Sequence, residues 1–141
     1  MIAATKRHKD IEFENYKIIF VKLNATEFFG FDKITQGDYF IFLANDEKLL
    51  IDCLLHERFA GNFDEIIKIV KRGNLKKDII IEYLKKINNI SLIKKVGFIL
   101  DKYKNIDISN EFKINDKNYI RLLRNMNKRK ISSKWRIYYD N

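Results

Sequence analysis

The sequence predicts an α+β fold, in which antiparallel strands near the N-terminus pack on a cluster of about four helices and a strand closes the C-terminus. Residues 1–43 hold short β-branched and aromatic runs separated by Asn and Gly, whereas residues 45–104 carry apolar side chains at helical spacing. Because the helices are collected between strands, the order favours α+β over a doubly wound sheet. We expect one domain over residues 1–141, whose last part, residues 105–141, is a basic tail with a closing strand over residues 135–139.

The strand-rich part is expected to begin with a hairpin. Residues 11–14 and 16–23 are β-rich runs separated by Asn15. Apolar side chains fall on both faces of residues 16–23, which predicts a central strand. Gln36-Gly37-Asp38 predicts a turn that leads into a strand over residues 39–43.

Four helices are expected in the middle of the chain. Asn45 and Asn62 are predicted N-caps of the first two, because each precedes acidic residues and an apolar stripe. A third helix is predicted over residues 76–87, and a fourth is expected to start at a Ser91 cap. Gly97 inside the fourth helix costs about 1 kcal/mol relative to Ala, which predicts the close approach of another helix.

Composition excludes several classes of protein. Apolar residues make up 46% of the chain and charged residues 33%, which is typical of a globular protein. No apolar run approaches the ~18–20 residues that span a bilayer, and the start of the chain lacks a signal-peptide core, so we expect a cytoplasmic protein without a membrane partner. The single cysteine, Cys53, rules out an internal disulfide framework and a Cys-rich zinc site. No nucleotide-binding loop occurs, and we expect no cofactor.

Charge is distributed unevenly along the chain. Residues 1–67 hold 8 basic and 12 acidic residues, whereas residues 68–141 hold 20 basic and 7 acidic ones. Cations interleaved with aromatic side chains can hold phosphates and stack bases, and a solvated basic face is the alternative. Residues 117–136 contain no acidic residue, and the candidate nucleic-acid or partner-binding residues there are Lys117, Arg121, Arg124, Lys128, Arg129, Lys130, Lys134 and Arg136.

The first predicted helix places a carboxylate inside an apolar run. A buried carboxylate is costly unless it is paired, so Asp52 is expected to form a structural ion pair with Lys94 or Lys95 of a later helix. Cys53 is expected to pack in the core.

The same helix raises the question of a divalent-metal nuclease. Such enzymes gather carboxylates around a cation, often beside a lysine. Asp46, Glu47 and Lys48 are consecutive, however, so on a helix they point about 100° apart and do not converge on one ion. We interpret them as a charged, capped first turn and expect no metal site.

The order of these motifs resembles the C-terminal domain of AbiEi-type antitoxins, transcriptional regulators of type IV toxin–antitoxin and abortive-infection systems. The resemblance is strongest over residues 45–54, with their acidic start, Lys48 and Asp52. It covers most of the chain and rests on the order and spacing of several segments. The others are Thr5-Lys6-Arg7, Phe28-Phe29-Gly30-Phe31, Phe59-Ala60-Gly61-Asn62, residues 93–100, and Lys134-Trp135-Arg136-Ile137 with Asn141.

The resemblance implies a non-enzymatic domain that counteracts a nucleotidyltransferase-like toxin, without requiring direct contact, and that helps to bind DNA through its basic surface. Family members usually carry an N-terminal winged helix-turn-helix that binds operator DNA. We expect this chain to lack it, because its first strands begin close to Met1. The alternatives are a stand-alone basic nucleic-acid-binding module and, third, a divalent-metal nuclease using Asp46, Glu47 or Asp52.

Overall fold

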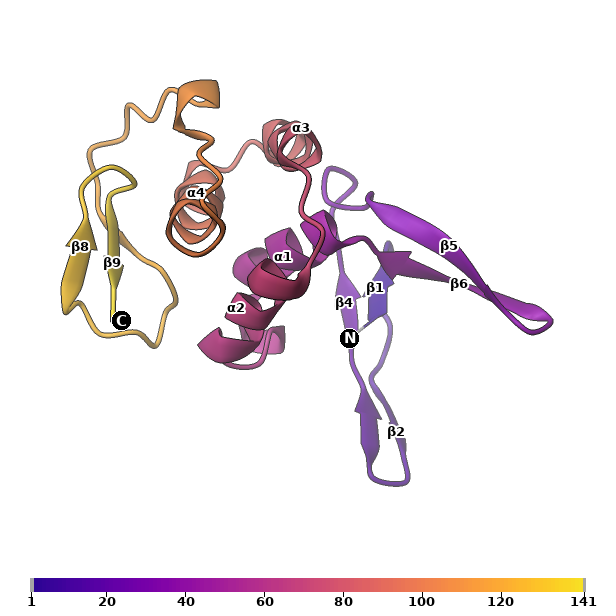
Figure 1. Ribbon diagram of the computed structural model, residues 1–141. Helices are drawn as coiled ribbons and strands as arrows, with labels where there is room; N and C mark the ends of the chain where they lie inside the picture. Colours follow the sequence, from indigo (N-terminus) through magenta and orange to yellow (C-terminus); the bar gives the residue numbers. More distant parts are fainter. Residues whose placement is uncertain (1, 141) are drawn as a thin grey trace. The chain divides into compact units, whose positions relative to one another are not determined.

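The fold is α+β, as the sequence predicts, with four α-helices and small sheets before and after them (Figure 1). The computed structural model describes residues 2–140, so Met1 and Asn141, the latter part of the family resemblance, lie outside the described residues. The chain divides into two compact units, residues 1–30 and residues 31–141.

The first unit contains two pairs of short strands. β2 (Ile11–Phe13) and β3 (Tyr16–Ile18) form the predicted hairpin, and Glu14 in its turn has a positive φ of 52°. β1 (Ile2–Ala4) pairs in parallel with β4 (Phe20–Lys22), whereas an antiparallel arrangement was expected.

The single central strand predicted over residues 16–23 is wrong. The Ile19 carbonyl accepts a hydrogen bond from the Ile2 N–H at 2.8 Å, so the pairing partner changes from β2 to β1 at this residue. A run that is apolar on both faces does not specify its partner, and here each half pairs with a different strand. Val21 and Leu23 are the buried side chains of this segment.

The second unit begins with a hairpin of β5 (Phe31–Gln36) and β6 (Tyr39–Ala44), which Figure 1 shows extending away from the helices. Gly37 has φ +60° in the predicted turn, a conformation that glycine adopts without strain. Large apolar side chains of β6 remain solvent-exposed, including Tyr39 at 79% and Phe42 at 61%. The hairpin therefore contributes little to the core.

Four helices then build the core: α1 (Asp46–Leu55), α2 (Phe63–Arg72), α3 (Lys77–Ile87) and α4 (Ile90–Lys104). A 3-10 turn, η1 (Glu57–Phe59), follows α1. The structure confirms both predicted N-caps: Asn45 Oδ1 accepts the Lys48 N–H at 2.9 Å, and Asn62 Oδ1 accepts the Glu65 N–H at 3.1 Å.

The cap of α4 is Asn89 and not Ser91 as predicted. Its Oδ1 accepts the Leu92 N–H at 3.0 Å, which places Ser91 inside the first turn. α4, the longest helix, has residues 92–94 and 96–100 withdrawn from solvent.

The chain after α4 passes η2 (Ser109–Glu111) and ends in a small sheet with strand order β7-β9-β8. β7 (Ile120–Arg121) runs parallel to β9 (Ile137–Tyr139), and β8 (Lys130–Ser132) runs antiparallel to it. The closing strand is present, but it starts at Ile137 and not at Trp135, because Arg136 takes a positive φ of 53°.

Gly97 makes room for the indole of Trp135 and not for another helix, which corrects the sequence prediction. A Cβ added at Gly97 would lie 2.6 Å from Trp135 Cε3 and still nearer to two other ring atoms. The indole is 1% exposed, and its Nε1 donates to Asp101 Oδ2 at 3.0 Å. This contact attaches the C-terminal segment to α4.

Replacing Gly97 by Ala is expected to destabilise the protein by about 1–3 kcal/mol, because overpacking against the buried indole outweighs the gain in helix propensity. Urea denaturation followed by circular dichroism measures this change. In a Trp135→Leu background the same Gly97→Ala substitution should be neutral or stabilising. Equal destabilisation in both backgrounds would contradict the assigned contact.

Candidate functional site

The carboxylates in the first turn of α1 hold backbone groups. Asp46 Oδ2 accepts the N–H of Asn74 at 2.8 Å, and Glu47 Oε1 accepts the N–H of Lys76 at 2.8 Å. Both donors lie in the connection between α2 and α3. Since Glu47 is only 4% exposed, this hydrogen bond compensates for the burial of its charge.

Asp52 forms an ion pair with Lys48, one turn earlier on the same helix. The lysine side chain is fully buried and that of Asp52 is 5% exposed, and the Lys48 ammonium also lies 5.7 Å from the centre of the Phe31 ring. The prediction that Asp52 forms an ion pair is correct, but its partner is Lys48 and not Lys94 or Lys95. Residues four apart on a helix are neighbours, so the pair forms within α1.

Lys94 and Lys95 form ion pairs elsewhere, which corrects their assignment to Asp52. Lys94 Nζ lies 2.7 Å from Asp116 Oδ2 and donates to the Asn118 carbonyl at 2.7 Å. Lys95 pairs with Glu57. Both lysines therefore connect α4 to segments that are far away in the sequence.

No group of three or more His, Cys, Asp or Glu side chains within residues 2–140 is placed to hold a metal ion. Asp46 and Glu47 bind different N–H groups, and Asp52 is paired with Lys48. Burial, followed by the nearby Asp52 charge, raises the pKa of the half-buried Cys53 thiol to about 11. A raised pKa disfavours the thiolate that nucleophilic chemistry needs.

The predicted basic residues fall into two groups, of which the first makes ion pairs or hydrogen bonds within the chain. Lys134 Nζ lies 2.8 Å from Asp101 Oδ2 and 2.9 Å from Asp107 Oδ2. The Ser109 backbone N–H and then Lys134 lower the pKa of Asp107 to about 2. In the same group, Arg129 Nε lies 3.2 Å from Asp140 Oδ1, and Arg136 donates to the Asp116 carbonyl.

The second group is exposed and forms no ion pair within residues 2–140; its members are Lys117, Arg121, Arg124, Lys128 and Lys130. Arg121 and Tyr138 are register partners across β7 and β9, so their side chains share one face of the C-terminal sheet. The Tyr119 and Tyr138 rings lie 5.3 Å apart, and the Lys128 ammonium is 4.9 Å from the Tyr138 ring centre. Cations and aromatic rings therefore meet on this outer sheet face.

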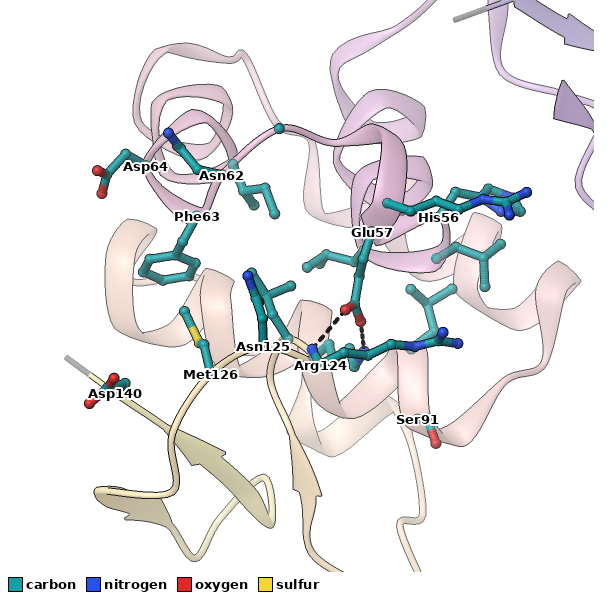
Figure 2. A pocket seen from close by; sticks show the side chains of 18 of the residues that line it. His56, Glu57, Asn62, Phe63, Asp64, Ser91, Arg124, Asn125, Met126 and Asp140 are labelled. Atoms are coloured by element: carbon teal, nitrogen blue, oxygen red, sulfur yellow. Dashed lines mark hydrogen bonds and ion pairs between the residues drawn. The ribbon is translucent and has the colours of Figure 1, made fainter. Parts of the chain in front are cut away.

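A groove of about 940 Å³, not predicted from the sequence, lies between α1, α2, the start of α4 and residues 123–126 (Figure 2). Glu57 stands at its centre, where it accepts the Arg124 N–H at 2.9 Å and pairs with Lys95. A smaller hollow of about 370 Å³ shares Lys95 and Arg124 with the groove and adds Arg121. The family resemblance includes Gly61 and Asn62, which line the groove, but nothing in the sequence indicates that they do so.

Within the described part of the chain, none of the helices has the length and apolar character needed to cross a membrane. No protein-family model matches the chain, and neither a curated protein nor a solved structure matches it significantly.

Replacing Lys48 by Met is expected to cost about 3–5 kcal/mol of stability, because it leaves the buried Asp52 charge without this partner. The double variant Lys48→Met with Asp52→Leu should recover much of that loss. Lys68→Met removes a lysine from an exposed pair with Glu65 and should cost no more than about 1 kcal/mol. Urea denaturation measures the free energy of unfolding of all three variants. If Lys48→Met lost as little stability as Lys68→Met, a structural role for the Lys48–Asp52 pair would be refuted.

Proposed function

We propose that this chain is a non-enzymatic antitoxin and transcriptional-regulator domain of the AbiEi type. It acts in the cytoplasm against a nucleotidyltransferase-like toxin and assists DNA binding through its basic C-terminal surface. The observation that carries the proposal is that residues in the segments that resemble the family make structural contacts. Lys48 and Asp52 form a buried pair inside α1, and Gly97 receives the Trp135 indole.

These contacts support an antitoxin domain because they are structural: the Lys48–Asp52 pair lies within α1, and the Trp135 indole attaches a distant segment to Gly97 of α4. A signature of an enzyme family would instead gather reactive side chains around a substrate. Here the acidic residues of α1 bind backbone groups or Lys48, and the Cys53 thiol is held protonated. A non-enzymatic role agrees with this use of the charged residues.

Co-expression of the chain with the neighbouring toxin gene is expected to relieve growth inhibition in the host. Because direct toxin contact is not required in type IV systems, rescue should occur whether or not the two proteins co-purify. Growth is compared with an empty vector and with the Lys48→Met variant, whose fold is weakened. Absence of rescue at equal expression would contradict the proposal.

A second candidate function is general nucleic-acid binding, favoured by the outer sheet face. Arg121, Lys128, Tyr119 and Tyr138 bring cations and aromatic rings together there. Guanidinium and ammonium groups bind phosphates, while tyrosine rings stack on unpaired bases.

Binding to a labelled single-stranded DNA should weaken steeply as salt increases, because each phosphate contact releases counterions. Lys128→Gln is expected to reduce the slope of log affinity against log salt by about 1, which is the contribution of one phosphate contact. Lys68→Gln on α2 removes an equal charge outside the basic block and should leave the slope unchanged. Fluorescence anisotropy measures the slopes, and salt-independent binding would exclude this function.

A further inference from the structure

The groove beside Glu57 has opposite charges at its two ends. Figure 2 shows Arg124 and Ser91 towards one end and Phe63, Met126 and Asp140 towards the other. Its size lies in the range of small-molecule sites, about 300–1,000 Å³. Such a hollow suits a ligand that is anionic at one end and carries hydrogen-bond donors at the other.

The cationic end gathers basic side chains from three separate segments. Arg58 comes from η1, Lys95 from α4 and Arg124 from the segment after β7, while Arg121 lines the adjoining smaller hollow. Glu57 is the acidic residue among them, and it is held by Lys95 and by the backbone of Arg124. The end therefore keeps an excess of positive charge.

Arg124 is placed to bind a ligand without loosening the fold. Its backbone N–H donates to Glu57 Oε2 at 2.9 Å, and its carbonyl accepts from the Arg121 guanidinium at 3.2 Å. Its own guanidinium forms no ion pair within the described residues and is exposed. Guanidinium groups bind phosphate or carboxylate oxygens with two parallel hydrogen bonds, so a phosphate is an anion that this end can hold.

The opposite end offers a flat apolar surface with acceptors around it. The Phe63 ring, at the start of α2, packs edge-on against Tyr103 at 6.0 Å, and Figure 2 places the Met126 side chain beside it. Asp64 and Asp140 line the same end, where Asp140 also pairs with Arg129 and accepts a hydrogen bond from Asn127. An aromatic ring flanked by carboxylates can stack a nucleobase and accept its amino hydrogens.

We propose that this groove binds a nucleoside phosphate, with the phosphate at Arg124 and Lys95 and the base against Phe63 and Met126. The proposal rests on the nucleic-acid binding proposed above and specifies its ligand. A free nucleotide and a nucleotide within a strand both offer the groove a phosphate and a base. The groove places these contacts around a hollow, whereas Lys128 and Tyr138 lie on the outer sheet face.

The test is a titration of the ¹⁵N-labelled full chain, followed by NMR, with inorganic phosphate, adenosine 5′-monophosphate and a short single-stranded oligoadenylate. The proposal expects shifts of the Ser91 and Arg124 amides with all three. The nucleotide should also shift Phe63 and bind at least about tenfold more tightly than inorganic phosphate, because base stacking adds affinity.

Two variants with a matched control locate the contacts. Arg124→Gln should weaken the nucleotide about tenfold, because it removes a charge-assisted pair of hydrogen bonds but leaves the backbone bond to Glu57. Phe63→Leu should weaken the nucleotide and leave inorganic phosphate unchanged. Lys128→Gln removes an equal charge from the outer sheet face, so it should weaken the oligoadenylate but not the mononucleotide.

The outcomes separate this proposal from the broader one. If the oligoadenylate binds and shifts only Lys128 and Lys130, the groove proposal is overturned while nucleic-acid binding stands. Equal affinity for phosphate and nucleotide, or equal losses in Arg124→Gln and Lys128→Gln, also overturns it. Binding of the mononucleotide without the oligoadenylate supports the groove and identifies a free nucleotide as its ligand.

Discussion

The polar contacts at the start of α1 are the constraint on which the helical core depends. Asp46 and Glu47 hold the N–H groups of Asn74 and Lys76, which fixes the connection between α2 and α3 against α1. Lys48 and Asp52 then neutralise each other inside the core. Because unpaired charges at these depths would be costly, the network admits one arrangement of the three helices and penalises others.

α4 extends this constraint to the rest of the second unit. The Trp135 indole rests on Gly97 and donates to Asp101, and Lys94 binds Asp116 and the Asn118 carbonyl. A strand pair as short as β8 and β9 is marginally stable on its own, so these attachments to a buried helix hold the C-terminal sheet in place.

The basic block divides between support of the fold and availability for a ligand. Lys134 binds Asp101 and Asp107. Arg121, Arg124 and Lys128 instead keep exposed charges beside the groove or on the outer sheet face. The number of basic residues in the acid-free run 117–136 is therefore larger than the number available to a partner. Acidic residues from distant segments, such as Asp101 and Asp107, pair with some of them in the folded chain.

The sequence by itself determined the α+β class, the presence of the four helices and the caps at Asn45 and Asn62, because these follow from local spacing and capping chemistry. The Lys48–Asp52 pair was also within its reach, since the two residues lie four apart on one helix. Tertiary structure alone decided the partners of Asp46 and Glu47, the indole over Gly97 and the groove around Glu57. Their partners are backbone groups or side chains more than 20 residues away, and no local pattern specifies which distant group a folded chain brings near.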